Sequence, residues 1–202
     1  MTSSDASRKT FEILGDHLHN NPKKRFDYEV FLKRAVGLWH PTARANRFVL
    51  GGVVELMLLE MLKSCGRNWQ PTRSSHNQDS FDISFLDGFH WSVKSSFTPH
   101  SGFKLVNGLG GSGKRWEHPT VFFVPNFGIV YVDPSAQLVE TQDVKDGIKI
   151  TESSVKAAVA ADGSNFISFY VPNKKCTEAL RREDHLELYA YEDVKKDLES
   201  AA

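Results

Sequence analysis

The sequence predicts a single α/β domain in which a mixed β-sheet is flanked by helices and preceded by an N-terminal helical segment. Three observations predict this class. Residues 81–94 alternate apolar and polar side chains as a hairpin does, residues 44–63 form a long apolar helix candidate, and residues 120–132 contain two apolar runs around a turn. A chain of 202 residues with 40% hydrophobic content can bury one substantial core.

The first 40 residues read as a helical lobe. Two amphipathic helices are expected, from about Lys9 to His19 and from Phe26 to Trp39, and Asn20-Asn21-Pro22 separates them. A third, longer helix is expected from Arg44 to Lys63, with a cap at Thr42 and a stop at Gly66. Its second half is apolar nearly all round, so it should lie buried against the sheet.

Two glutamates stand in this third helix. Glu55 lies inside the apolar run, where an ionised carboxylate is costly unless a cation or a hydrogen-bond partner compensates it. It can face solvent at a helix edge, or pair with Arg47 or Arg44. Glu60 lies about 140° further round the helix, which indicates a solvent-facing or ion-paired residue.

The hairpin at 81–94 has one apolar face and one polar face that carries reactive side chains. The length of its turn decides which residues of the two strands are paired. A two-residue turn at Asp87-Gly88 would set Asp82 against Val93 and bury the acid among hydrophobic residues. A three-residue loop, with Gly88 left-handed in a bulge, sets Asp82 against Ser92. We predict the second register, because it alone gathers five apolar residues on one face: Phe81, Ile83, Phe85, Trp91 and Val93.

This register places Asp82 beside Lys94 at a sheet edge, a pairing that suits phosphodiester hydrolysis. A carboxylate binds a hard divalent cation, and the cation polarises the phosphate and lowers the pKa of its bound water. A lysine can orient or help deprotonate that water and can steady the charge that develops on phosphorus.

Asp82 followed after nine residues by Ser92-Val93-Lys94 resembles the PD-(D/E)xK nuclease signature, in the SxK form that some type II restriction endonucleases use. The resemblance covers roughly Gly51 to Pro134. It implies a restriction-endonuclease-like fold with residues 42–134 as catalytic core. The implied site has Asp82, Ser92, Lys94 and Glu55 as catalytic residues, with Asp82 and Glu55 holding Mg²⁺ as cofactor.

The resemblance also implies partners. These are double-stranded DNA carrying a short palindrome and a second copy of the chain, since a two-fold dimer matches a symmetric site. In this family the N-terminal lobe, residues 1–40, often forms the dimer interface. The apolar residues of that lobe can equally belong to the core; they include Phe31, Leu38 and Trp39.

Ser92 departs from the commonest family pattern, which has Glu or Asp there. A serine is a poor magnesium ligand, so a second carboxylate is expected from Glu55 or from Glu117. Two acids brought together without metal repel. Glu55→Gln and Asp82→Asn are therefore expected to leave the stability of the metal-free protein unchanged or raised.

A glycine-rich segment follows the lysine strand. Residues 107–115 formally contain GxxxxGK, but Arg115 stands where a phosphate-binding loop needs Ser or Thr, and Pro119 breaks the helix that should follow. We therefore expect no nucleotide cofactor. The segment can contact the DNA backbone or grooves, or be a plain surface loop. The residues expected to contact DNA are His100, Lys104, Asn107, Lys114, Arg115 and His118.

The remaining chain, residues 135–202, reads as a C-terminal α/β extension. Its expected elements are helices at 151–161, 177–180 and 192–200 and strands at 165–171 and 186–191. Before it, Thr120 to Pro134 reads as a hairpin of two buried strands around Asn126-Phe127-Gly128.

Charge favours a nucleic-acid partner only locally. The formal net charge is zero, which excludes a whole-chain attraction to nucleic acid or to anionic membranes. Between Lys63 and His118, however, seven Lys or Arg residues stand against four acids. The two cysteines show no pairing pattern, and no apolar signal region or bilayer-length apolar run is present, so a cytoplasmic protein is expected.

Two other functions remain open from the sequence. A structure-selective nuclease, similar to Holliday junction resolvases, would share the helix glutamate and the Asp…xK arrangement. A DNA-binding module in which Ser92 marks lost catalysis would show no metal-dependent nicking.

Overall fold

The computed structural model describes residues 3–39, 41, 44–74, 81–98, 102–105, 116–135, 139–144 and 147–177. Its α-helices are α1 (Ser3–Asn20), α2 (Pro22–Leu38), α3 (Arg44–Ser64) and α4 (Glu152–Ala161), and two short 3₁₀ helices follow at Gly163–Asn165 and Lys174–Thr177. Its strands are β1 (Thr72–Arg73), β2 (Ile83–Ser84), β3 (His90–Ser95), β4 (Phe103–Leu105), β5 (Thr120–Val124), β6 (Gly128–Val132), β7 (Thr141–Val144), β8 (Gly147–Ile150) and β9 (Phe166–Ile167).

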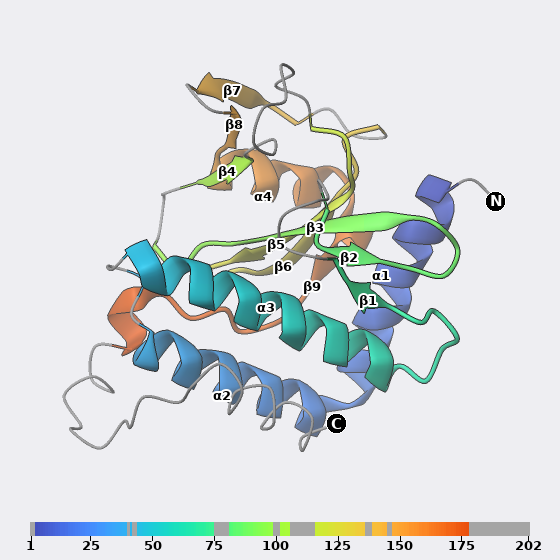
Figure 1. Ribbon diagram of the computed structural model, residues 1–202, viewed down its shortest axis with the longest axis horizontal. Coiled ribbons are helices and arrows are strands. Elements are labelled where there is room, and N and C mark those ends of the chain that lie inside the picture. The colour runs from blue at the N-terminus through green and yellow to red at the C-terminus, as the bar shows by residue number, and fades with distance from the viewer. Residues whose placement is uncertain are drawn as a thin grey trace.

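The strands form two sheets, so the expected mixed α/β class is confirmed. The larger sheet has the order β1-β2-β3-β5-β6-β9, and the smaller has the order β4-β8-β7. Only the β3–β5 pair among these is parallel, with Ser92 opposite Thr120 and Lys94 opposite Phe122. The chain between β3 and β5 contributes β4 to the smaller sheet, which places that sheet beside the end of β3 (Figure 1).

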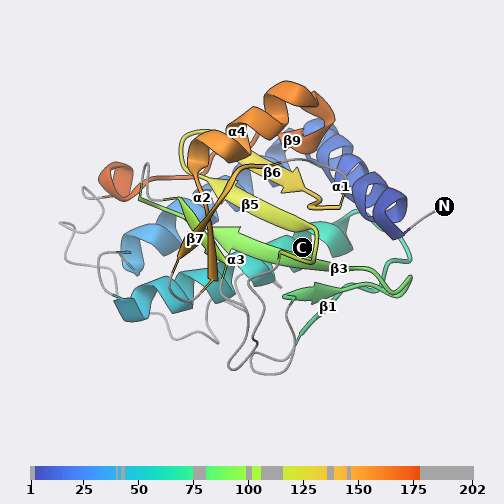
Figure 2. The same ribbon diagram turned by 90° about the horizontal axis from the view of Figure 1, so that it is seen from above.

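The larger sheet separates two hydrophobic cores. On one face, the apolar sides of α1, α2 and α3 pack against alternate strand residues such as Trp91, Val93 and Phe123. On the other face, α4 and the smaller sheet pack against the intervening residues, among them Phe122 and Val130. Figures 1 and 2 show this order of layers, with α3 on one side of the strands and α4 on the other.

The helical lobe was predicted in outline. α2 begins at Pro22, earlier than the expected Phe26, because proline is favoured in the first turn of a helix. α3 ends at Ser64, followed by Gly66 at φ +65°, as expected. The expected cap at Thr42 lies outside the described residues. In this chain Trp39 is buried in the core under the sheet, and Phe31 and Leu38 pack partly buried against it, which favours the core alternative for all three.

Polar contacts, two of them buried hydrogen bonds, tie α1 to β3, to β6 and to the end of α4. The Trp91 indole donates to Ser7 Oγ at 2.7 Å, and Ser7 Oγ lies 2.8 Å from the Tyr131 hydroxyl. Ser4 donates to Asp133 at 2.5 Å, and Arg8 forms an ion pair with Asp162. Burial raises the pKa of Tyr131, so its hydroxyl stays protonated and can serve this cluster as a hydrogen-bond partner.

The predicted hairpin register is confirmed. Ile83 pairs with Trp91 and Ser84 with His90, and the same register sets Asp82 against Ser92. The connecting loop has three residues, and Gly88 within it adopts φ +81°. Phe81 departs from the expected apolar face. It lies outside β2, which covers only Ile83–Ser84, and its ring stacks on the His90 ring with the centroids 3.8 Å apart.

Gly88→Ala tests how far this turn matters. A Cβ at Gly88 would meet no atom within 4 Å, so the substitution carries only the cost of a left-handed conformation, about 1 kcal/mol. We expect urea denaturation to show that loss. Gly163→Ala is the control, since a Cβ there also meets nothing within 4 Å and its φ is not left-handed. An equal loss in both variants would contradict the assignment.

The smaller sheet was not predicted. Its β7–β8 hairpin pairs Val144 with Gly147 around a short connection, and the Asp146-Gly147 step was an available turn signal. The expected helix at 151–161 is confirmed as α4, capped by Thr151, whereas the strand expected at 165–171 is shortened to β9. The elements expected at 177–180, 186–191 and 192–200 lie mostly or wholly outside the described residues. None of the described helices combines the length and hydropathy needed to cross a membrane.

Candidate functional site

One face of the larger sheet changes character partway across. Over β5 and β6 it is apolar and covered by α4 and the smaller sheet. Over β1, β2 and β3 the same face carries polar residues, because opposed strand residues point to one side and the register aligns them. We call this part of the sheet the polar half-face; it consists of Thr72, Ser84, His90, Ser92 and Lys94. Thr72 and Ser84 are hydrogen-bonded through their hydroxyls at 2.8 Å.

Asp82 and Lys94 meet as predicted, but they do so where β2 ends beside β3 and not on an edge strand, because β2 and β3 both lie inside the larger sheet. The Lys94 amine lies 3.2 Å from Asp82 Oδ2, and the same oxygen accepts the Val93 backbone N–H at 2.6 Å. The Asp82 side chain therefore replaces the backbone of β2 where that strand ends. Both side chains are partly exposed, at 23% for Asp82 and 30% for Lys94, so solvent or a ligand can reach them. Ser92 is buried beside them.

Glu55 is held by a cation from the sheet. Arg73 donates from Nε and Nη2 to Glu55 Oε2 at 2.9 and 2.7 Å. Arg73 is opposed to Ile83, whose side chain lies in the core beneath α3, so the guanidinium points toward that helix. The expectation that an arginine pairs with Glu55 is met by Arg73 in place of Arg47 or Arg44. Glu60 pairs with Lys63, as expected for an ion-paired residue.

The carboxylates suit a divalent cation only in part. Asp82 accepts both of its hydrogen bonds through Oδ2, and no described residue hydrogen-bonds to Oδ1, so Asp82 can offer one oxygen ligand. Glu55 would have to share its carboxylate with Arg73. Glu117, the other expected acid, is exposed. Within the described ranges, no three His, Cys, Asp or Glu residues converge on a common metal position.

The Glu55–Arg73 ion pair reverses the direction of the stability change that the sequence predicts for Glu55→Gln. In the described structure Arg73 pairs with Glu55 and Lys94 pairs with Asp82, so the charge of each carboxylate is offset by a neighbouring cation. Both Glu55 and Arg73 are largely buried, and neutralising one partner leaves the other poorly compensated. After allowance for the partial exposure of Arg73, we expect a loss of about 1–3 kcal/mol in the free energy of unfolding.

Glu60→Gln is the matched control for this substitution. Glu60 is on the same helix and as buried as Glu55, but Lys63, its partner, is half exposed, so the loss should stay below about 1 kcal/mol. Urea denaturation of both variants decides the matter. A Glu55→Gln protein that is as stable as the wild type would restore the original expectation of repulsion.

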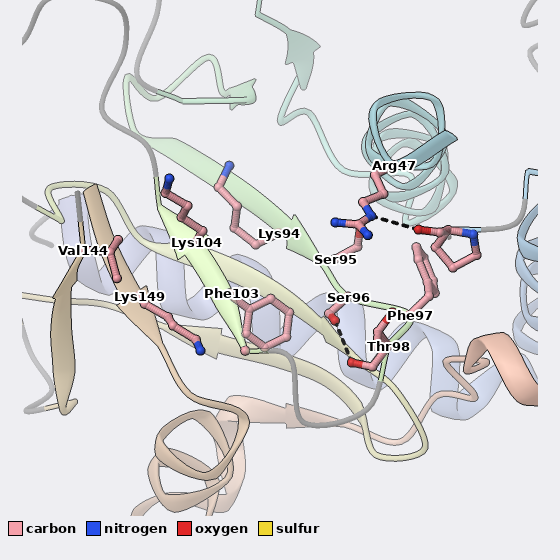
Figure 3. A pocket seen from close by; sticks show the side chains of 12 residues that line it. Arg47, Lys94, Ser95, Ser96, Phe97, Thr98, Phe103, Lys104, Val144 and Lys149 are labelled. Carbon is pink, nitrogen blue, oxygen red and sulfur yellow. Dashed lines mark hydrogen bonds between the residues drawn. The ribbon is translucent and has the colours of Figure 1, made fainter. Parts of the chain in front are cut away.

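A basic pocket lies next to Asp82 and Lys94. It has a volume of about 600 Å³ and is lined by residues of α3, β3, β4, β7 and β8 together with the segments after α2 and β3. Among the described residues that line it, four are cations and none is a carboxylate. We use "basic pocket" for this site throughout; its cations are Arg47, Lys94, Lys104 and Lys149 (Figure 3).

The basic pocket was only partly foreseen. Lys104, expected to contact DNA, lines it, but Arg47 had been considered only as a partner of Glu55 and Lys149 had not been singled out. His118, another expected contact, lies edge-on to Phe81 and His90 beside the polar half-face. Four further expected contacts lie outside the described residues: His100, Asn107, Lys114 and Arg115.

Cys65 does not add a nucleophile to the site. Burial raises the pKa of its thiol to about 11, so the thiol is protonated at neutral pH. It donates to the carbonyl of Met61 at 3.4 Å on α3. The chemistry available here is therefore that of the carboxylate, the lysine and the surrounding cations.

Comparison with protein-family models, with curated proteins and with solved structures returns no match.

Proposed function

We propose that this protein is a Mg²⁺-dependent endonuclease of the PD-(D/E)xK superfamily that hydrolyses phosphodiester bonds of double-stranded DNA. The observation that carries the proposal is the contact of Lys94 with Asp82, 3.2 Å apart, at the partly exposed point where β2 ends beside β3. The Asp82…Ser92-Val93-Lys94 motif and the four cations of the adjacent basic pocket support it.

Each residue has a distinct role in this proposal. Asp82 would hold Mg²⁺ through Oδ1, and the ion when bound supplies charge neutralisation at the phosphate and an acidified water. Lys94 orients the attacking water and steadies the negative charge that develops on phosphorus. Ser92, buried beside them, keeps the strand geometry in which Asp82 faces Lys94. Glu55 serves as the second acid if it shares its carboxylate with Arg73.

The proposed biological role is that of a type II restriction endonuclease. One active site cuts one strand, so cleavage of both strands of a short palindrome requires two copies of the chain arranged about a two-fold axis. We propose such a homodimer on DNA. A resolvase-like nuclease would use the same site on branched DNA.

A second function is favoured by one specific observation. Asp82 and Glu55 each bind a cationic side chain, and no group of three acids or histidines converges among the residues that the structure describes. Such an arrangement suits a module that binds DNA phosphates without cutting them.

Incubation with DNA separates these functions. A linear duplex of mixed sequence and a four-way junction are each treated with the protein, in Mg²⁺ and in EDTA. Discrete duplex fragments in Mg²⁺ alone support the restriction endonuclease, and cleavage confined to the junction supports the resolvase-like enzyme. If the protein binds both DNAs but nicks neither of them, in Mg²⁺ or in Mn²⁺, the result supports the DNA-binding module and contradicts both nucleases.

A further inference from the structure

We propose that the basic pocket binds a single nucleotide unit of the DNA strand, with the phosphate on its lysines and the sugar and base against its apolar wall. Its volume of about 600 Å³ falls in the range of about 300–1,000 Å³ found for small-molecule sites. The identification of the nucleotide as part of a DNA strand rests on the proposed function; the binding of a phosphate ester does not.

The first argument is the placement of two lysines. Lys104 on β4 is directly opposed to Lys149 on β8 in the antiparallel ladder of the smaller sheet. Opposed residues of a ladder point to the same side of a sheet, so this pairing presents two lysines to the lining of the pocket. A phosphate offers several oxygens to ammonium donors of this kind.

The second argument is the convergence of cations from separate elements. Lys94 comes from β3 and Arg47 from α3, and Figure 3 shows the amines of Lys94 and Lys104 pointing to the same side of the pocket. Arg47 Nε donates to the carbonyl of Pro41 at 2.8 Å, which fixes the guanidinium at the rim. A phosphate there would meet several preplaced charges and, within the described lining, no carboxylate.

The third argument is the apolar wall. Phe97 and Phe103 line the basic pocket although they are buried, and Val144 lies on the same lining. A wall of this kind contributes no binding energy to a free inorganic anion, whereas bases and sugars pack well against aromatic side chains. The combination of cationic and aromatic lining therefore favours a nucleotide over a bare phosphate.

The pocket shares Lys94 with the candidate site. The same amine contacts Asp82 and lines the pocket, so a nucleotide bound there would lie directly beside the proposed point of cleavage. The pocket would then hold the nucleotide next to the scissile phosphate, and Lys104 and Lys149 would be binding residues without a part in the chemical step.

The test is calorimetric titration of the full chain in EDTA at low salt with thymidine 5′-phosphate, thymidine and inorganic phosphate. We expect thymidine 5′-phosphate to bind more tightly than either of the others. Lys104→Gln/Lys149→Gln should weaken it roughly tenfold, the effect of losing one to two charge-assisted contacts. Lys9→Gln/Lys33→Gln, two exposed lysines of α1 and α2, is the charge-matched control and should bind as the wild type does.

Thermal unfolding gives a second, independent measure of this binding. Thymidine 5′-phosphate should raise the Tm of the wild type and of the Lys9→Gln/Lys33→Gln control, and should raise the Tm of the Lys104→Gln/Lys149→Gln protein by much less. Equal affinity for phosphate and thymidine 5′-phosphate, equal affinity in both double variants, or no binding would each overturn the inference.

The outcomes also separate this inference from the proposed function. Nucleotide binding lost in the Lys104→Gln/Lys149→Gln protein, together with no cleavage of any DNA by the wild type, supports the pocket and removes the nuclease. Metal-dependent cleavage by a protein that binds no nucleotide in the pocket supports the nuclease and removes the pocket inference.

Discussion

Lys94→Ala is expected to lower Mg²⁺-dependent DNA cleavage by about 10²–10⁴-fold, the usual contribution of a positioned group that handles a proton. The side chain is the one cation that contacts Asp82 in the described structure. Its removal takes away both the group that orients water and a charge next to the phosphate. The fold should persist, because a partly exposed ion pair contributes only about 0–1 kcal/mol and Asp82 still accepts the Val93 N–H.

Cleavage rates under single-turnover conditions measure this effect, and circular dichroism with urea denaturation measures the fold. Lys33→Ala, an exposed lysine on α2, is the control and should cut at the wild-type rate. A Lys94→Ala protein that cuts within threefold of the wild type would remove Lys94 from the site and with it the nuclease proposal.

Asp82→Asn is expected to abolish the dependence of cleavage on Mg²⁺, with a loss of activity of a hundredfold or more on the same scale. The amide oxygen of Asn can still accept the Val93 N–H, so the strand edge keeps its geometry. What disappears is the negative charge that a hard cation needs from its ligand. Stability should change by less than about 1 kcal/mol, since the lost pair with Lys94 is partly exposed.

Asp87→Asn is the matched control, because Asp87 lies exposed in the loop of the same hairpin, five residues along the chain. A Mg²⁺ titration of cleavage should show the wild-type curve for Asp87→Asn and no saturable dependence for Asp82→Asn. Normal Mg²⁺ dependence in the Asp82→Asn protein would show that the metal, if one is used, is held elsewhere.

The meeting of Asp82 with Lys94 could be predicted because the hairpin has one apolar face. A shift of one residue would have turned a whole strand over, so burial of Ile83, Phe85 and Trp91 selects a single register. Gly88 then supplies the left-handed conformation that the three-residue loop needs. Here local pattern and tertiary packing demand the same pairing.

The partner of Glu55 could not be predicted in this way. Arg73 lies on β1, a strand of two residues, which is too short to show an alternating pattern. Its position comes from pairing with β2, and that pairing depends on the rest of the sheet. The sequence offered as partners two arginines of the same helix, Arg44 and Arg47.

The basic pocket was hidden for a related reason. Lys104 and Lys149 are opposed only because β4 pairs with β8, strands far apart in the chain. Lys104 stands in a three-residue strand, and Lys149 in a short hairpin whose Asp146-Gly147 turn signal was the only local indication. No property of either lysine marks it as the partner of the other.

The hydrogen bonds that hold α1 have a consequence for the order in which the fold can form. Ser4, Ser7 and Arg8 all bond to residues more than eighty positions further along the chain. During synthesis these partners emerge well after α1, and contacts between such distant segments form slowly because long loops must close first. Until β3 and β6 have been made, the apolar side of α1 has no sheet to cover. A helix that precedes every other described element is thus secured only once the strands of the central sheet are in place.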